Sequence, residues 1–240
     1  ADHPGLHQYC DTQGLPELVE ALTDRVRERS GLPWERESVL VTAGATAGLG
    51  CAVGALASPG DEVLILAPFW PLIRGDVPAA GATPAEVPFY DRVDSVAGAL
   101  EAVRARASDR TVALYVSTPS NPTGRVLPGD WLEALADLAR REDWWLLADE
   151  VYQDFVYTGE HVPLAPLAPE RTLSSFSFSK AYGMAGNRVG YLVGPAECIA
   201  QAQKLGTHSS YNAPVPCQVA ALRALEQGGG WQDTAREQYR

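Results

Sequence analysis

The sequence is poor in cysteine and histidine, and this shortage excludes several kinds of site. Its four cysteines, Cys10, Cys51, Cys198 and Cys217, have no CxxC spacing. The four histidines, His3, His7, His161 and His208, add no ligand pattern. We therefore expect no metal centre and no disulfide framework, but free thiols in a reducing compartment.

Basic residues and long apolar runs are also scarce. Lysine and arginine total 19 against 30 acidic residues, which gives a formal net charge of -11. This balance argues against electrostatic binding to nucleic acid or to an anionic membrane surface. No apolar run approaches the roughly 20 residues that span a bilayer, and no signal peptide is recognisable. The expected location is the cytoplasm.

What the 240 residues do contain is an alternation of apolar strands and helices, with 46% hydrophobic residues. The pattern predicts helices at 14–30, 95–107 and 129–141, and a mostly helical stretch over 195–228 that is interrupted at 212–214. It predicts seven strands, at 39–43, 62–67, 83–88, 111–117, 144–148, 172–179 and 189–194. This alternation indicates a three-layer α/β/α fold around a mainly parallel seven-stranded sheet.

A glycine-rich turn at 44–50 follows the first predicted strand and leads into a helix. Free backbone N–H groups and the helix dipole make such a turn a place for a phosphate. The spacing is neither GxGxxG nor GxxxxGK[ST], so it lacks the dinucleotide and nucleoside-triphosphate signatures. Gly48, Gly50 and Gly54 each cost the helix about 1 kcal/mol against alanine. Close backbone packing would explain them.

The stretch 174–190 carries the candidate reactive group, Lys180. Phe176 and Phe178 alternate with serines, which is strand periodicity, so we expect Lys180 at a strand-to-loop corner. Other predicted strand ends supply Trp70, Asn121 and the pair Asp149 and Tyr152. Carboxyl ends of parallel strands line one crevice, so these groups should meet there.

Such a set suits a phosphorylated pyridine aldehyde. This cofactor needs a lysine for a Schiff base, a carboxylate for its ring nitrogen, phosphate donors and an aromatic face. Three motifs, SNPTG at 120–124, ADEVY at 148–152, and SFSK followed by GNRVG around 177–190, appear in order. On these motifs the sequence, from about residue 9 to 228, resembles the fold-type I pyridoxal-phosphate enzymes, specifically the class I/II aminotransferases.

The resemblance implies a role for each matching position. Lys180, Asp149 and Tyr152 would be catalytic: Lys180 forms the Schiff base and Asp149 pairs with the pyridine nitrogen. Tyr9 would reach the phosphate of a neighbouring subunit, which implies a homodimer with shared active sites. The cofactor-binding set comprises these four residues and Ala45, Thr46, Ala47, Trp70, Asn121, Ser177 and Arg188.

The implied activity is the transfer of an amino group between an amino acid and a 2-oxo acid. Residues 9–228 would form the cofactor-binding large domain. Residues 229–240 would start a helix leading to a C-terminal small domain not present in this chain. That domain supplies the arginine for the substrate carboxylate in relatives, and the sequence does not reveal which amino acid is the donor.

Three alternatives remain at this point. A lyase or cyclising enzyme of the same cofactor family could use the same residues for β- or γ-elimination. The segment 177–180 also reads S-x-x-K, and 210–212 resembles the S-x-N element of penicillin-recognising serine enzymes, but no K-T-G follows and the lysine is expected on a strand rather than a helix. A sensor domain of a transcription regulator lacks support, because no basic DNA-reading segment is present.

Overall fold

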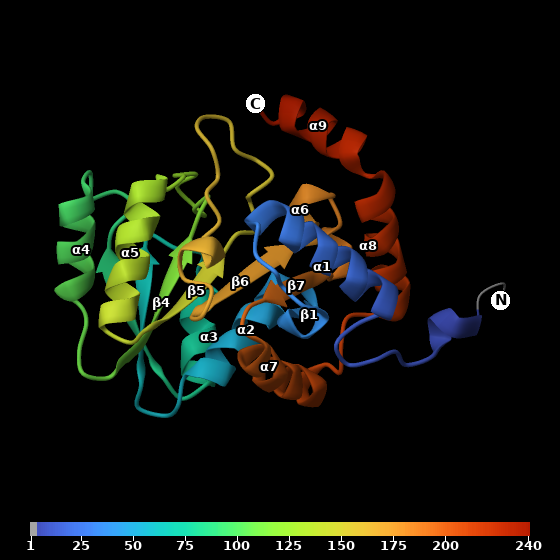
Figure 1. The fold of residues 1–240 in the computed structure, drawn as a ribbon, viewed down its shortest axis with the longest axis horizontal. Coiled ribbons are helices and arrows are strands. Elements are labelled where there is room, and N and C mark those ends of the chain that lie inside the picture. Colours follow the sequence, from blue (N-terminus) through green and yellow to red (C-terminus); the bar gives the residue numbers. More distant parts are fainter. Residues whose placement is uncertain (1–3) are drawn as a thin grey trace.

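A seven-stranded sheet forms the centre of the computed structural model, which describes residues 4–240 (Figure 1). The strand order is β1-β7-β6-β5-β4-β2-β3, with β7 antiparallel to both neighbours and the other pairs parallel. The strands are β1 (Val39–Thr42), β2 (Glu62–Ala67), β3 (Thr83–Pro88), β4 (Thr111–Ser117), β5 (Trp145–Asp149), β6 (Thr172–Ser177) and β7 (Gly190–Val193). The predicted mainly parallel seven-stranded sheet is confirmed. His3 lies outside the described residues.

Helices cover both faces of this sheet. One face carries α2 (Gly44–Leu56), α3 (Ile73–Ala79) and α7 (Ala196–Ser209). The other face carries two helix pairs, which lie at opposite ends of the sheet in Figure 1: α4 (Val96–Arg104) with α5 (Gly129–Arg141), and α1 (Pro16–Ser30) with α8 (Val215–Gln227). Three layers result, as the alternation of strands and helices predicts.

Alternating side chains of the buried strands divide the core between the layers. In β4, Leu114 and Val116 pack toward α4 and α5, whereas Ala113 and Tyr115 belong to the cluster under α2, α3 and α7. A third cluster joins α1 to β1, β6 and β7. Side chains that are neighbours in a strand point to opposite faces, so adjacent residues at a strand end serve different cavities.

The remaining helical segments are short or terminal. They are α6 (Phe178–Ala181), α9 (Gly229–Gln238) and 3₁₀ turns at Pro4–His7, Arg36–Ser38, Ala165–Leu167 and Ala185–Asn187. Neither α3 nor α6 was expected from the sequence. The expected glycine-rich turn at 44–50 is also helical, because α2 begins at Gly44. Gly48 and Gly54 do pack closely there: an added Cβ would lie 3.1 Å from Thr42 Oγ1 and 2.9 Å from Leu205 Cδ1, respectively.

The predicted strand 172–179 was too long. Strand β6 stops at Ser177, whose hydroxyl accepts a 3.0 Å hydrogen bond from the Ser179 amide and caps α6. Lys180 therefore lies in a single helical turn, not at a strand-to-loop corner. The strand argument against the S-x-x-K alternative is wrong for the same reason, since Ser177 starts a helical turn that contains the lysine.

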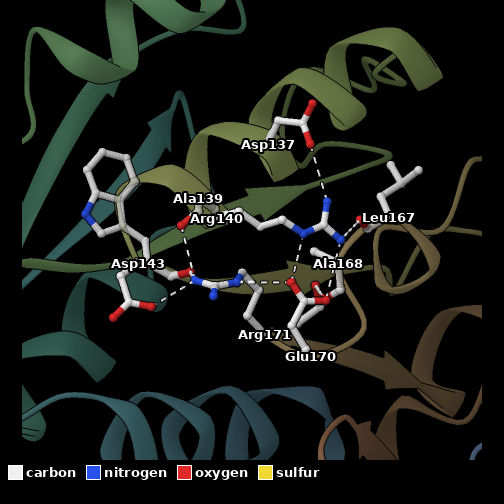
Figure 2. Close-up of polar contacts among 10 residues, drawn as sticks. Asp137, Ala139, Arg140, Asp143, Leu167, Ala168, Glu170 and Arg171 are labelled. Atoms are coloured by element: carbon white, nitrogen blue, oxygen red, sulfur yellow. Dashed lines mark hydrogen bonds and ion pairs between the residues drawn. The ribbon is translucent and has the colours of Figure 1, made fainter.

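An ionic cluster ties α5 to the amino ends of β5 and β6 (Figure 2). Lys180 follows the carboxyl end of β6, at the opposite end of that strand. Arg171 Nη1 donates to the carbonyls of Ala139 at 3.2 Å and Trp144 at 3.1 Å. Arg140 pairs with Glu170 at 2.9 Å. The arginine bonds to backbone carbonyls fix the end of the helix against the start of both strands.

Candidate active site

A cavity of about 160 Å³ lies beside the N-terminus of α2 and the carboxyl ends of β5 and β6. The sequence-predicted residues that line it are Ala45, Thr46, Trp70, Asn121, Asp149, Tyr152, Ser177, Lys180 and Arg188. They come from segments far apart in the chain. The fold thus brings nine of the predicted cofactor-binding residues together around one cavity.

Two predicted residues lie elsewhere. Ala47 lines a separate small hollow with Tyr211 and Asn212. Tyr9 is 87% exposed, and its ring stands 5.0 Å from that of Tyr211. Neither residue lines the Lys180 cavity of its own chain. The role of Tyr9 in a neighbouring subunit stays a prediction.

One end of the cavity is rich in hydrogen-bond donors. Helix α2 begins there with no side-chain cap, so its first backbone N–H groups have no partner within the helix. Arg188 lies directly over Gly44, where an added Cβ would collide with the guanidinium. The Arg188 Nη1 atom donates to the Ala185 carbonyl at 2.9 Å. Helix dipole and guanidinium together make this end suitable for an anion such as a phosphate.

The buried end is acidic. Asp149 is 4% exposed, and its Oδ2 accepts a 2.6 Å hydrogen bond from the Tyr115 hydroxyl. The Val151 amide approaches Oδ1 at 3.4 Å. Burial raises the pKa of Asp149, and the bond from Tyr115 opposes that rise. A cation placed in the cavity would pair with this carboxylate.

Lys180 lines this cavity and also the larger hollow beside it. Its side chain is exposed, and Nζ stands 5.7 Å from the centroid of the Tyr152 ring. Asn121 Nδ2 lies 3.5 Å from the Tyr152 hydroxyl. Within residues 4–240, Lys180 forms no salt bridge. Its amine is therefore accessible to a carbonyl compound in the cavity.

Tyr115 is a site residue that sequence reasoning missed. It is fully buried in β4, next to Leu147 of β5, and Ser117 is the register partner of Asp149. A buried tyrosine hydroxyl normally finds a partner. A lone tyrosine within the apolar run 111–117 was the available signal, but which carboxylate it meets depends on the sheet register.

The comparison with known families decides what this site belongs to. A family model described as aminotransferase class I and II matches residues 1–239. The chain belongs to the class I and II aminotransferases. Family membership also rejects the alternative of a penicillin-recognising serine enzyme. The helical turn that contains Lys180 does not by itself argue against that alternative.

Individual aminotransferases resemble the chain along nearly its whole length. It is 38% identical over 239 residues to an aspartate/prephenate aminotransferase of Thermus thermophilus, covering 98% of the chain and 62% of that protein. It is 37% identical to an arginine–pyruvate transaminase of Pseudomonas aeruginosa, covering 98% and 60%. The chain thus spans less than two thirds of the length of these relatives.

Solved structures agree with the sequence relatives. Aspartate aminotransferase from Thermus thermophilus with maleate superposes with a TM-score of 0.92 at 38% identity, covering 98% of the chain and 62% of that structure. N-succinyldiaminopimelate aminotransferase from Mycobacterium tuberculosis gives a TM-score of 0.90 at 33% identity, with the same coverage. The three-layer fold is that of the aminotransferases.

Over residues 4–240, no helix has the length and apolar character needed to cross a membrane. The same residues contain no cluster of histidine, cysteine, aspartate and glutamate able to hold a metal ion. All four cysteines carry free thiols.

Proposed function

We propose that the protein is a pyridoxal-phosphate-dependent aminotransferase, which moves an amino group between an amino acid and a 2-oxo acid. The observation that carries the proposal is the meeting of Lys180 and Asp149 in one cavity, which the N-terminus of α2 and Arg188 also line. When bound, pyridoxal phosphate supplies an aldehyde for an amine and a ring that withdraws electrons from the substrate Cα.

The donor-rich end would hold the phosphate. The backbone amides of residues 45–47 belong to the first turn of α2 and have no partner within the helix, and the Thr46 hydroxyl would add a donor. Ser177 and Arg188 complete this end. Arg188 suits it because its planar fork can donate two parallel hydrogen bonds to phosphate oxygens.

Asp149 would accept a hydrogen bond from the protonated ring nitrogen. The pairing satisfies the buried carboxylate and keeps the ring cationic, since an opposite charge favours the charged form. Trp70, half-buried at the end of β2, would stack on the ring, and Tyr152 and Asn121 would hydrogen-bond its oxygen.

Lys180 would act twice. Its amine would first condense with the cofactor aldehyde, with release of water. Once a substrate amine has displaced it, the free Lys180 amine would act as the general base that takes a proton from the substrate Cα and as the acid that returns it. Its exposure and its freedom from salt bridges within residues 4–240 leave the amine available for both steps.

A second hollow would admit the substrate. It measures about 600 Å³, shares Asn121, Tyr152 and Lys180 with the first, and has aromatic walls that include Tyr157 and Trp231. The relatives' names include aspartate, prephenate and arginine, so they do not identify one amino donor. All are aminotransferases or transaminases, which favours transfer over elimination or cyclisation.

We further propose that the protein works as a homodimer in which Tyr9 reaches the partner's phosphate site. Residues 9–228 would be the cofactor-binding large domain, and 229–240 would lead into a small domain. Free thiols are consistent with a reducing compartment such as the cytoplasm.

The test is a panel of amino acids offered, each with a 2-oxo acid, to the full-length protein loaded with pyridoxal phosphate. The proposal predicts that at least one donor yields its 2-oxo acid together with a new amino acid, and that Lys180→Ala abolishes both. Release of ammonia or of a side-chain fragment without amino transfer would instead identify a lyase.

A further inference from the structure

Glu150 is a buried charge that the proposed reaction does not use. It follows Asp149 at the end of β5 and is 1% exposed. Asp149 lines the Lys180 cavity, whereas Glu150 lines a different cavity of about 360 Å³ next to α1. The two adjacent carboxylates therefore point to opposite faces of the sheet.

Two side chains from separate segments hold this carboxylate. Ser174 of β6 donates a 2.9 Å hydrogen bond to Oε1 of Glu150. His161, from the connection between β5 and β6, places Nε2 2.7 Å from Oε2, and Nε2 is the donor because a carboxylate only accepts. The Glu150 amide also donates to the Ser175 carbonyl at 3.0 Å. Glu150 thus fastens the end of β5 both to β6 and to the returning connection.

The other charged groups of this cavity have partners of their own. Asp154 lies 2.6 Å from Arg29 of α1, and Arg236 of α9 donates to the Asp154 backbone carbonyl at 3.1 Å. His161 is the cationic partner of Glu150 when protonated, and its Nδ1 has no hydrogen-bond partner in the described part of the chain. Among the described residues, Glu150 is therefore the only hydrogen-bond partner of the His161 imidazole.

The elements that Glu150 joins also carry the cofactor residues. Strand β5 ends at Asp149, and the chain then continues into the turn that contains Tyr152. Strand β6 ends at Ser177, three residues before Lys180. We propose that Glu150, held by His161 and Ser174, is a positioning residue that fixes Asp149 and the Tyr152 turn relative to Lys180. This inference rests on the proposed function, because its consequence is the hold on pyridoxal phosphate.

The test compares Glu150→Ala with Glu62→Ala in the full-length protein. Glu62 is a matched control because it is 8% exposed and accepts hydroxyl hydrogen bonds from Thr111 at 2.7 Å and Ser108 at 3.2 Å, at the amino end of β2. Each variant is freed of cofactor and titrated with pyridoxal phosphate. The dissociation constant, the induced circular dichroism of the bound cofactor and the melting temperature of the cofactor-free form are measured.

Both substitutions should lower the melting temperature. Only Glu150→Ala should also change the dichroism and weaken cofactor binding. We expect a loss of about tenfold in affinity, the lower end of the range for residues that orient metal ligands. Glu150→Gln should recover part of the cofactor affinity and part of the dichroism. Ser174→Ala, a milder variant, should shift the dichroism in the same direction, whereas Ser108→Ala should not. If the Glu150 variants keep the parent affinity and dichroism, the positioning role is wrong. If the parent itself does not bind pyridoxal phosphate, the proposed function fails as well.

Discussion

The Tyr115 hydroxyl and the Asp149 carboxylate form a 2.6 Å hydrogen bond in the interior of the protein, with the tyrosine donating. Both residues are at most 4% exposed. The bond orients the carboxylate and favours its ionised form against the effect of burial, which raises the pKa of Asp149. Tyr115 therefore supports the charge that the proposed cofactor ring requires.

Replacing Tyr115 with phenylalanine should weaken pyridoxal phosphate binding. Loss of a hydrogen bond to a charged group costs about 1.5–3 kcal/mol, which corresponds to a dissociation constant roughly 10 to 100 times higher. Tyr90→Phe is the control, because Tyr90 is another buried tyrosine and its hydroxyl donates to the Ser117 carbonyl at 2.6 Å instead. Equal affinities of the two variants, measured by titration, would contradict a special role for Tyr115.

Arg188→Lys should affect phosphate recognition alone. Lysine keeps the charge but loses the planar fork, so binding of pyridoxal phosphate should weaken about tenfold. Binding of pyridoxal, which lacks the phosphate, should stay unchanged. Fluorescence titration with both compounds measures the contrast, and a similar loss for each would place Arg188 away from the phosphate.

Gly190→Ala should disturb the contact between β7 and α2. An added Cβ would lie 2.6 Å from the Ala45 amide nitrogen and 2.6 Å from the Phe176 carbonyl oxygen, both backbone atoms. We expect a stability loss of about 1–3 kcal/mol, together with weaker phosphate binding as the N-terminus of α2 shifts. Gly186→Ala is the control, since nothing lies within 4 Å of its added Cβ. Urea unfolding distinguishes them, and two equal midpoints would refute the clash.

The buried carboxyl group of Asp76 should make the stability of the protein depend on pH. Burial raises its pKa from 3.8 to about 6, and its Oδ2 has no partner in the described residues. Between these values the folded protein retains a proton that the unfolded chain has released, so stability should fall as pH rises from 3.8 to about 6. Asp76→Asn should flatten that fall and raise the melting temperature at pH values above the window.

Thermal melts across this pH range test the Asp76 prediction. Asp109→Asn is the control, because Asp109 is exposed in a turn. If Asp76→Asn and Asp109→Asn give the same profile as the parent protein, the burial of the Asp76 carboxyl does not govern the dependence.

Much of the fold follows from periodicity, because long buried runs such as 62–67 and 111–117 leave little choice of structure. Helix α5 was predicted with its observed bounds, 129–141. The turn at Lys180 was not, since the Ser177 cap is a local hydrogen bond that overrides the serine–phenylalanine alternation. Helix α3, which contains Pro78, has little helical signature.

The site shows the same division. Motifs predicted that Asn121, Asp149, Lys180 and Arg188 share one site, and all four line the same cavity. Such grouping is expected because strand ends meet at one edge of a parallel sheet. Tyr115 and Glu150 could not be assigned partners, because their contacts depend on strand register and on a long connection returning to the sheet.

The most direct test of the account is to find where pyridoxal phosphate attaches. The full-length protein is loaded with cofactor, reduced with borohydride to fix the link, digested and analysed by mass spectrometry. The account predicts one modified peptide, carrying the added mass on Lys180, and none in Lys180→Ala. Labelling at another lysine, with Lys180 unmodified, would contradict it.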